Sequence, residues 1–306
     1  MSTCATASLQ SAEPVAGTAA TARTWLLIEQ SGPWGARALT DSRLDPATGR
    51  ALEAAAEGTG VRVALIRRPG RHADDQDARR RVFLAHTAPG RSWIRTATVD
   101  APEQLLDLDF PALGAGDHGG LYEPYAGDPL VLVCTNGKRD RCCALLGRPL
   151  AAELAATGAE AWEVTHIGGH RFSPTLFVLP YGYAYGRASA HLAKDALEAA
   201  REGRVTPDHC RGRSTWERPA QAADLAVREL IREERADALD ILGTAPVTSP
   251  TGATAPPSWT VTVGHRDGRS WRVTVEQRAD GAPSPASCGA AALPPVRMAV
   301  TAIRAA

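Results

Sequence analysis

The sequence lacks an excess of either charge, and it lacks any long hydrophobic run. Its 306 residues contain 34 Lys and Arg against 34 Asp and Glu, so the formal net charge is zero. Non-specific nucleic-acid binding depends on a basic face, and this balance therefore argues against it. No apolar stretch approaches the roughly 20 residues that a membrane helix requires. Residues 1–22 have neither the basic start nor the apolar block of a signal peptide, so we expect a cytoplasmic protein without membrane or nucleic-acid partners.

Several signatures of common enzyme classes are missing as well. The chain has no Walker or Rossmann fingerprint, which argues against binding of NAD, FAD or ATP. It has no Gly-x-Ser-x-Gly nucleophile elbow and no Cys-x-x-Cys redox pair. The sequence therefore does not indicate a nucleotide-dependent enzyme, a serine hydrolase or a Cys-x-x-Cys oxidoreductase.

Cysteine is present at six positions, and half of them are clustered. Cys134, Cys142 and Cys143 lie close together, on a loop rich in Lys, Arg and Asp. Disulfide frameworks are typical of short secreted chains, so a cysteine cluster in a long chain favours metal binding or redox chemistry. The scattered cysteines are expected to be free thiols: Cys4, Cys210 and Cys288.

Residues 128–202 predict the element order of a thioredoxin-like domain. The order is strand, loop, helix, strand, loop, two strands and helix, read from apolar runs, turn residues and a Ser cap. The expected elements are Leu130–Val133, Arg148–Thr157, Trp162–Thr165, Thr175–Leu179, Tyr183–Tyr185 and Ser189–Glu202.

The rest of the chain is expected to divide around this unit. We expect residues 1–22 to form a loose lead-in, residues 23–127 an N-terminal α/β domain, residues 128–205 the thioredoxin-like domain, and residues 206–306 a helical and β-hairpin extension. The fold class is therefore α/β. One continuous two-lobed unit is the alternative. The N-terminal strands are expected at Trp25–Glu29, Val61–Ile66, Arg81–His86 and Trp93–Val99.

Turns and linkers are expected where glycine, proline or charge is concentrated. Gly114–Gly127 is Gly-rich and is predicted to be a linker, as is Val247–Pro257, whereas Arg67–Arg80 is predicted to be a charged loop. In the extension, an apolar face predicts a helix over Ala220–Leu242. Arg266-Asp267-Gly268 predicts the turn of a hairpin.

Two groups of possible metal ligands follow two of the predicted strands. Cys134 comes directly after the first strand and is followed by the Cys142-Cys143 doublet, while His166 and His170 follow the next strand. If these strands lie side by side, both loops open at the same edge of the sheet and the four ligands converge. Thiolate and imidazole suit both iron–sulfur clusters and zinc.

The spacing of these residues helps to separate the two metals. Structural zinc sites typically take cysteines two to four residues apart, whereas seven or eight residues separate Cys134 from its partner. Rieske centres take one Cys and one His from each local motif, whereas this chain keeps its cysteines in one loop and its histidines in the other. The pattern favours an asymmetric cluster with one iron held by sulfur and one by imidazole. Neutral imidazoles should raise its potential above that of a four-cysteine ferredoxin and make it depend on pH.

The ligand motifs are specific enough to suggest a family. Cys-Thr-Asn-Gly-Lys-Arg-Asp-Arg-Cys-Cys followed by His-Ile-Gly-Gly-His-Arg-Phe resembles the sucrase/ferredoxin-like family, a branch of the thioredoxin-like ferredoxins. The resemblance implies a [2Fe–2S] cluster. Fungal relatives have one cysteine where this chain has a doublet, and spacing favours Cys143 over Cys142 by one residue. The ligands that the resemblance implies are Cys134, Cys143, His166 and His170.

We therefore predict an electron-transfer or redox-sensing protein with a [2Fe–2S] cluster, a redox partner protein and no substrate chemistry of its own. The alternative is a zinc-stabilised thioredoxin-like scaffold that binds a partner, and a third possibility is a thiol oxidoreductase that uses Cys142 or Cys143. The charged run Lys138–Arg141 is either a solvated loop or a source of hydrogen bonds to cluster sulfur or to an acidic partner. Within it, Asp140 is a candidate acceptor for a ligand histidine.

Overall fold

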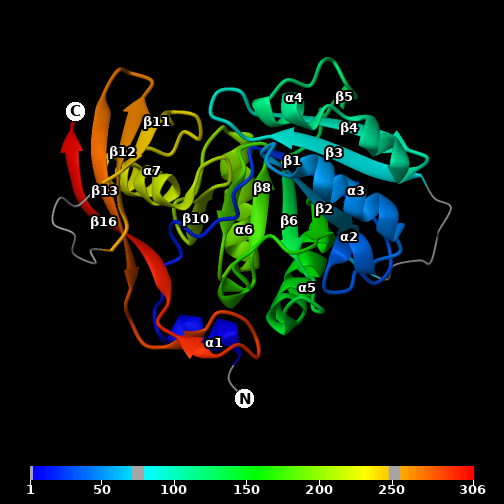
Figure 1. Ribbon diagram of the computed structural model, residues 1–306, viewed down its shortest axis with the longest axis horizontal. Coiled ribbons are helices and arrows are strands. Elements are labelled where there is room, and N and C mark those ends of the chain that lie inside the picture. Colours follow the sequence, from blue (N-terminus) through cyan, green and yellow to red (C-terminus); the bar gives the residue numbers. More distant parts are fainter. Residues whose placement is uncertain (1–2, 71–78, 248–255) are drawn as a thin grey trace.

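Two sheets organise the protein (Figure 1). The computed structural model describes residues 3–70, 79–247 and 256–306, so most of the charged loop and of the second linker lies outside the described residues. Within those ranges, the larger sheet has ten strands in the order β10-β9-β8-β6-β7-β2-β1-β3-β4-β5, and a four-stranded antiparallel sheet stands beside it. The predicted α/β class is confirmed.

The N-terminal part of the large sheet is covered on one face by short helices. Strand β1 lies between β2, with which it pairs in parallel, and β3, with which it pairs antiparallel. Helix α3 begins at Pro46 because Asp45 caps it, its Oδ2 accepting from the Thr48 N–H at 2.8 Å. These elements are β1 (Thr24–Glu29), α2 (Ala38–Asp41), α3 (Pro46–Ala56), β2 (Val61–Arg67), β3 (Arg80–His86), β4 (Trp93–Val99), the 3₁₀ turn Pro102–Asp107, α4 (Phe110–Ala115) and β5 (Glu123–Pro124).

The stretch predicted as the linker Gly114–Gly127 is part of this packed unit. Its β5 residues pair with β4, and the Arg95 guanidinium binds the carbonyls of Leu121 and Tyr122. The linker prediction was wrong because it rested on glycine content alone. Tertiary hydrogen bonds hold this Gly-rich segment in place.

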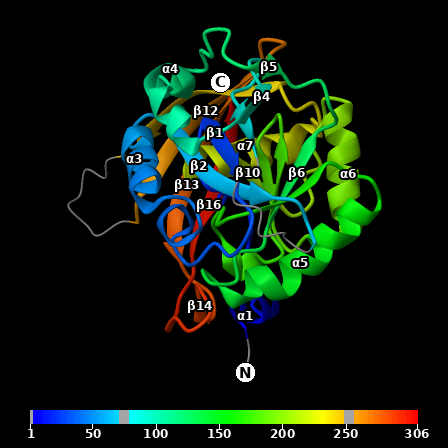
Figure 2. The ribbon, with the colours of Figure 1, turned by 90° about the vertical axis from the view of Figure 1, so that its right-hand side faces the viewer.

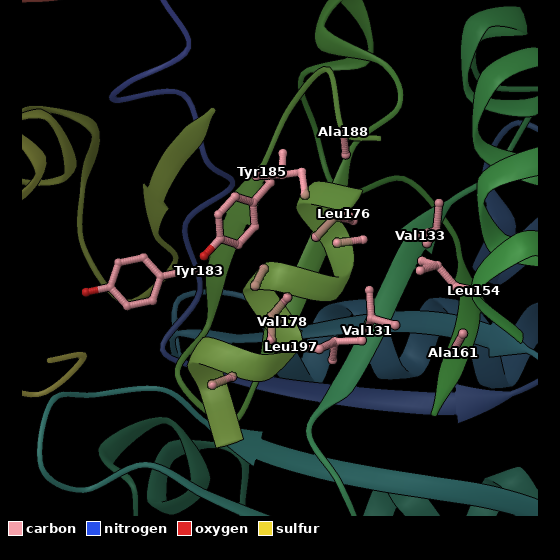
Figure 3. Packing of buried hydrophobic residues seen from close by; sticks show 14 of the residues in the cluster. Val131, Val133, Leu154, Ala161, Leu176, Val178, Tyr183, Tyr185, Ala188 and Leu197 are labelled. Carbon is pink, nitrogen blue, oxygen red and sulfur yellow. The ribbon is translucent and has the colours of Figure 1, made fainter. Parts of the chain in front are cut away.

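The next part of the chain has the element order predicted for a thioredoxin-like unit. Strand β6 pairs in parallel with β7 and antiparallel with β8, and β8 pairs with β9. Helices α5 and α6 cover the face that carries Val131 and Val178, as Figure 3 shows. Ser189 caps α6, as predicted, through the Leu192 N–H. The elements are β6 (Leu130–Cys134), α5 (Arg141–Ala156), β7 (Ala161–Val164), the 3₁₀ turn η2 (His170–Phe172), β8 (Leu176–Leu179), β9 (Tyr183–Tyr185), α6 (Ala190–Arg201) and β10 (Cys210–Arg213).

Helix α5 begins at Arg141, well before the predicted start at Arg148. Asp140 caps it, with Oδ1 accepting from the Cys142 N–H at 2.9 Å. The prediction placed Pro149 in the first turn, but it lies inside the helix, where it leaves the Leu145 carbonyl without its usual N–H donor. The cysteine doublet therefore lies on the first turn of a helix.

The large sheet curls so that strands distant in the sheet touch across its concave face. Trp25 of β1 lies 4.7 Å from Phe177 of β8 between ring centroids. The two halves join where β2 pairs with β7, and there Arg67 forms a buried ion pair with Glu163 at 2.6 Å. The segments expected to form two domains thus contribute strands to one sheet.

The C-terminal part packs helix α7 against the four-stranded sheet. The predicted hairpin is confirmed, with β12 and β13 antiparallel. The predicted helix Ala220–Leu242 is too long, because Arg232 adopts a left-handed φ of 53° and Arg228 binds the carbonyls of the chain that turns back. The elements are α7 (Arg218–Ile231), β11 (Leu239–Pro246), β12 (Ser258–His265), β13 (Ser270–Ala279), β14 (Ser284–Pro285), β15 (Ala292–Leu293) and β16 (Val296–Ala305).

The lead-in that was expected to be loose is packed against the rest of the chain. Its described residues include α1 (Cys4–Gln10), and Arg187 donates to the Ser8 carbonyl at 2.9 Å. Arg171 pairs with the nearly buried carboxylate of Glu13 at 2.8 Å. Helix α1 lies beside the β14–β15 segment, so the first helix of the chain contacts a segment close to the last strand in the sequence (Figures 1 and 2). The contacts of Arg171 and Arg187 with residues 8–13 join segments that are distant in sequence, so the sequence of the lead-in alone did not predict its packing.

Candidate metal centre

The predicted ligand loops meet at one edge of the sheet because their strands are parallel neighbours. Cys134, the last residue of β6, is in register with Val164, the last residue of β7. His166 follows β7 directly, and Cys143 enters from the first turn of α5. The expectation that these strands lie side by side is confirmed, and it places Cys134 and His166 at the same edge.

The two thiols of Cys134 and Cys143 interact inside the protein. Hydrogen bonding with Cys143 holds the pKa of Cys134 well below its usual value, and His166 and the Ile167 N–H act in the same direction against the effect of burial. The same interaction, together with burial, raises the pKa of Cys143. Cys143 also accepts a hydrogen bond from Ser173 Oγ at 3.6 Å. Within this pair, the hydrogen bond from the Cys143 thiol thus favours the thiolate of Cys134.

The two histidines lie together and leave ring nitrogens without partners. Their ring centroids are 4.9 Å apart, and burial lowers the pKa of His170. Among the described residues, neither His166 Nδ1 nor His170 Nδ1, both buried, has a hydrogen-bond partner. Buried polar atoms are normally satisfied, so a cation ligated by these atoms would account for both.

The histidine loop is held in shape by glycines and arginines. Gly168 and Gly169 adopt left-handed φ values of 78° and 70°, which other residues rarely accept. Arg62 donates to the His166 carbonyl at 2.9 Å, and Arg211 donates to the Gly168 carbonyl at 3.0 Å. A Cβ at Gly169 would clash with the Arg211 guanidinium.

These arginines also make the surroundings of the sulfur positive. Burial lowers the pKa of Arg62, and it lowers the pKa of Arg211 to about 10, while the nearby Cys134 raises both. Buried guanidinium groups remain charged at neutral pH. An anionic group held at this edge would be stabilised by their charge.

The other member of the doublet, Cys142, belongs to a second group. Its Sγ lies 3.5 Å from Cys4 Sγ and 3.2 Å from Cys288 Sγ. Asp140 completes this group, and its four donor atoms could hold a metal ion. Asp140, a candidate acceptor for a histidine, accepts instead from the N–H groups of Cys142 and Cys288. The predictions missed this group because its members are distant in sequence.

The fold and the site define an α/β protein with a buried thiol–imidazole centre at the edge of a curled sheet. The chain belongs to the sucrase/ferredoxin-like family, whose family model matches residues 15–212. The match includes Cys134, Cys143, His166 and His170 and excludes Cys4 and Cys288. No curated protein and no solved structure matches the chain. Within the described ranges, no helix is long and apolar enough to cross a membrane.

Proposed function

We propose that the protein carries a [2Fe–2S] cluster on Cys134, Cys143, His166 and His170 and acts in electron transfer or redox sensing. The observation that supports the proposal is the chain of contacts from Cys143 through Cys134 and His166 to His170, together with two buried imidazole nitrogens that have no hydrogen-bond partner among the described residues. This donor set suits a cluster with one iron bound by sulfur and the other by nitrogen. When bound, the cluster supplies a one-electron redox couple.

The surrounding residues are suited to raising the potential of this couple. Two neutral imidazoles in place of thiolates leave the site less negative, and the partly buried Arg62 and the buried Arg211 add positive charge. Both effects favour the reduced state, which carries one more negative charge. The expected potential therefore lies above that of a four-cysteine ferredoxin.

The exposed residues beside the ligands support docking of an acidic redox partner protein. Lys138, Arg139 and Arg141 are exposed between Cys134 and Cys143. A short basic surface next to a redox centre brings an acidic partner close through long-range attraction. Exchanging these residues for Glu should slow electron exchange with an acidic donor and reverse its salt dependence.

The ligand assignment is tested by substitution at the centre and at a matched cysteine outside it. Cys134→Ser and His166→Ala should remove most of the iron and sulfide from anaerobically purified protein. Cys210→Ala changes another buried cysteine, in β10, and should leave both unchanged. Full iron and sulfide content in both ligand variants would contradict the proposal. A colourless wild-type protein with zinc bound by two sulfurs and two nitrogens would replace it with a zinc-stabilised scaffold.

A further inference from the structure

A second cluster of thiols lies where helix α1 and the segment between β14 and β15 meet the first turn of helix α5. Cys4 comes from α1, Cys142 from the first turn of α5, and Cys288 from the segment between β14 and β15. Their Sγ atoms are separated by 3.5 Å (Cys4–Cys142), 3.6 Å (Cys4–Cys288) and 3.2 Å (Cys142–Cys288). Both carboxylate oxygens of Asp140 lie 3.7 Å from Cys4 Sγ.

These separations suit ligation of one ion. All four donor atoms lie within 4.8 Å of one another. Thiolates bound to one zinc ion at about 2.3 Å in a tetrahedron lie about 3.8 Å apart, so the sulfurs need to move by only a few tenths of an ångström. A disulfide needs sulfurs about 2.0 Å apart and would leave one of the three thiols unpaired.

The donors are held in place by backbone contacts. Asp140 accepts from the N–H groups of Cys142 at 2.9 Å and of Cys288 at 2.8 Å, so its carboxylate fixes two of the three cysteines. The positive end of the α5 dipole also faces this cluster, which favours an anionic set of ligands.

We propose that Cys4, Cys142, Cys288 and Asp140 form a structural zinc site, separate from the cluster centre. Three thiolate sulfurs and one carboxylate oxygen are all zinc donors, and together they supply the four ligands of a closed tetrahedral site. Binding of Zn²⁺ replaces the three thiol protons, which pass to solvent. The choice of zinc rests on the soft thiolates and the compact geometry.

This zinc site adds a cross-link between α1, α5 and the β14–β15 segment to the contacts that Arg187 makes with Ser8 and Arg171 makes with Glu13. Helix α1 has only seven residues, and an isolated helix below roughly 12–15 residues is marginal in water. The apolar cluster around it is small, with Ala5 beside the cysteines. Helix α1 also contacts the η2 turn that begins at His170. The zinc site thus fastens helix α1 and the β14–β15 segment beside the histidine loop.

The experiment measures zinc content and zinc-edge X-ray absorption on the full-length protein. Wild type should contain about one zinc per chain, with three sulfur neighbours and one oxygen neighbour. In Cys4→Ala and Cys288→Ala, zinc should fall at least tenfold, and amide exchange in α1 should rise. Cys210→Ala, the matched control, should keep both properties of the wild type.

Three results would overturn the zinc site alone. These are zinc below one tenth per chain in the wild type, zinc unchanged in both variants, or a disulfide among these cysteines in anaerobic protein. Two sulfur and two nitrogen neighbours would place the zinc on Cys134, Cys143, His166 and His170 instead, and would overturn the proposed function as well. Absence of iron together with a three-sulfur zinc site would overturn the proposed function alone.

Discussion

Cys142 and Cys143 are adjacent in helix α5, yet their side chains belong to different groups. Cys142 Sγ lies 3.2 Å from Cys288 Sγ, whereas Cys143 interacts with Cys134 and accepts from Ser173. Successive residues on a helix point about 100° apart, so one doublet can serve two sites. Each cysteine of the doublet therefore has its own set of neighbours, and neither duplicates the other.

The first prediction separates the two cysteines. Cys143→Ser should lose most of the iron and sulfide and keep its zinc, because its Sγ lies with Cys134. Cys142→Ser should keep iron and sulfide and lose zinc. Metal and sulfide analysis of both variants checks this, and loss of iron in Cys142→Ser alone would reverse the assignment.

The second prediction concerns the charge on the ligands. His166→Cys or His170→Cys should keep a cluster and lower its reduction potential by on the order of 100 mV, because a thiolate adds negative charge where imidazole is neutral. Protein-film voltammetry measures the shift. His191→Cys, on the exposed face of α6, is the control and should leave the potential unchanged. An unchanged potential in both loop variants would mean that the histidines are not ligands.

The third prediction concerns the glycine that lets the histidine loop turn. Gly169→Ala should destabilise the protein by more than the roughly 1–2 kcal/mol of a left-handed alanine, because the new Cβ would also displace Arg211. Gly58→Ala has a similar φ of 73° but open space around it, so it isolates the backbone cost. Urea unfolding compares the two. Equal losses would show that the Arg211 contact is unimportant.

The fourth prediction concerns stability at low pH and rests on His86. Burial lowers its pKa to about 4, and nearby Arg91 acts in the same direction. Thr24 Oγ1 donates to the Leu113 carbonyl at 2.7 Å, so His86 Nδ1 must donate to Thr24. Its buried Nε2 therefore remains unprotonated, and it has no partner among the described residues.

The sign of this effect follows from proton linkage. Above about pH 6.5 the ring is neutral in both the folded and the unfolded states. Between about pH 6.5 and 4 the unfolded chain binds the proton and the folded chain does not. As the pH is lowered through this range, the free energy of unfolding therefore falls by about 3 kcal/mol. His86→Asn should be less sensitive to pH than wild type in urea unfolding across this range. Parallel curves for the two proteins would contradict the prediction.

The parts of the site predicted from sequence are those fixed by local pattern. Apolar runs predicted β6 and β7, and their parallel pairing placed Cys134 beside the histidine loop. The start of α5 was missed because Asp140 lies in a charged run typical of a solvated loop, although it is the cap of the helix. The second thiol group could not be predicted, since Cys4 and Cys288 are 284 residues apart and only tertiary packing joins them.

Mössbauer spectroscopy of iron-57-enriched protein, with iron and sulfide analysis of the same sample, tests the central claim most directly. We expect about two irons and two sulfides per chain. The oxidised protein should show two iron environments in equal amounts, one bound by sulfur alone and one bound also by nitrogen. A single iron environment typical of four-cysteine ligation, or a protein without iron, would contradict the account.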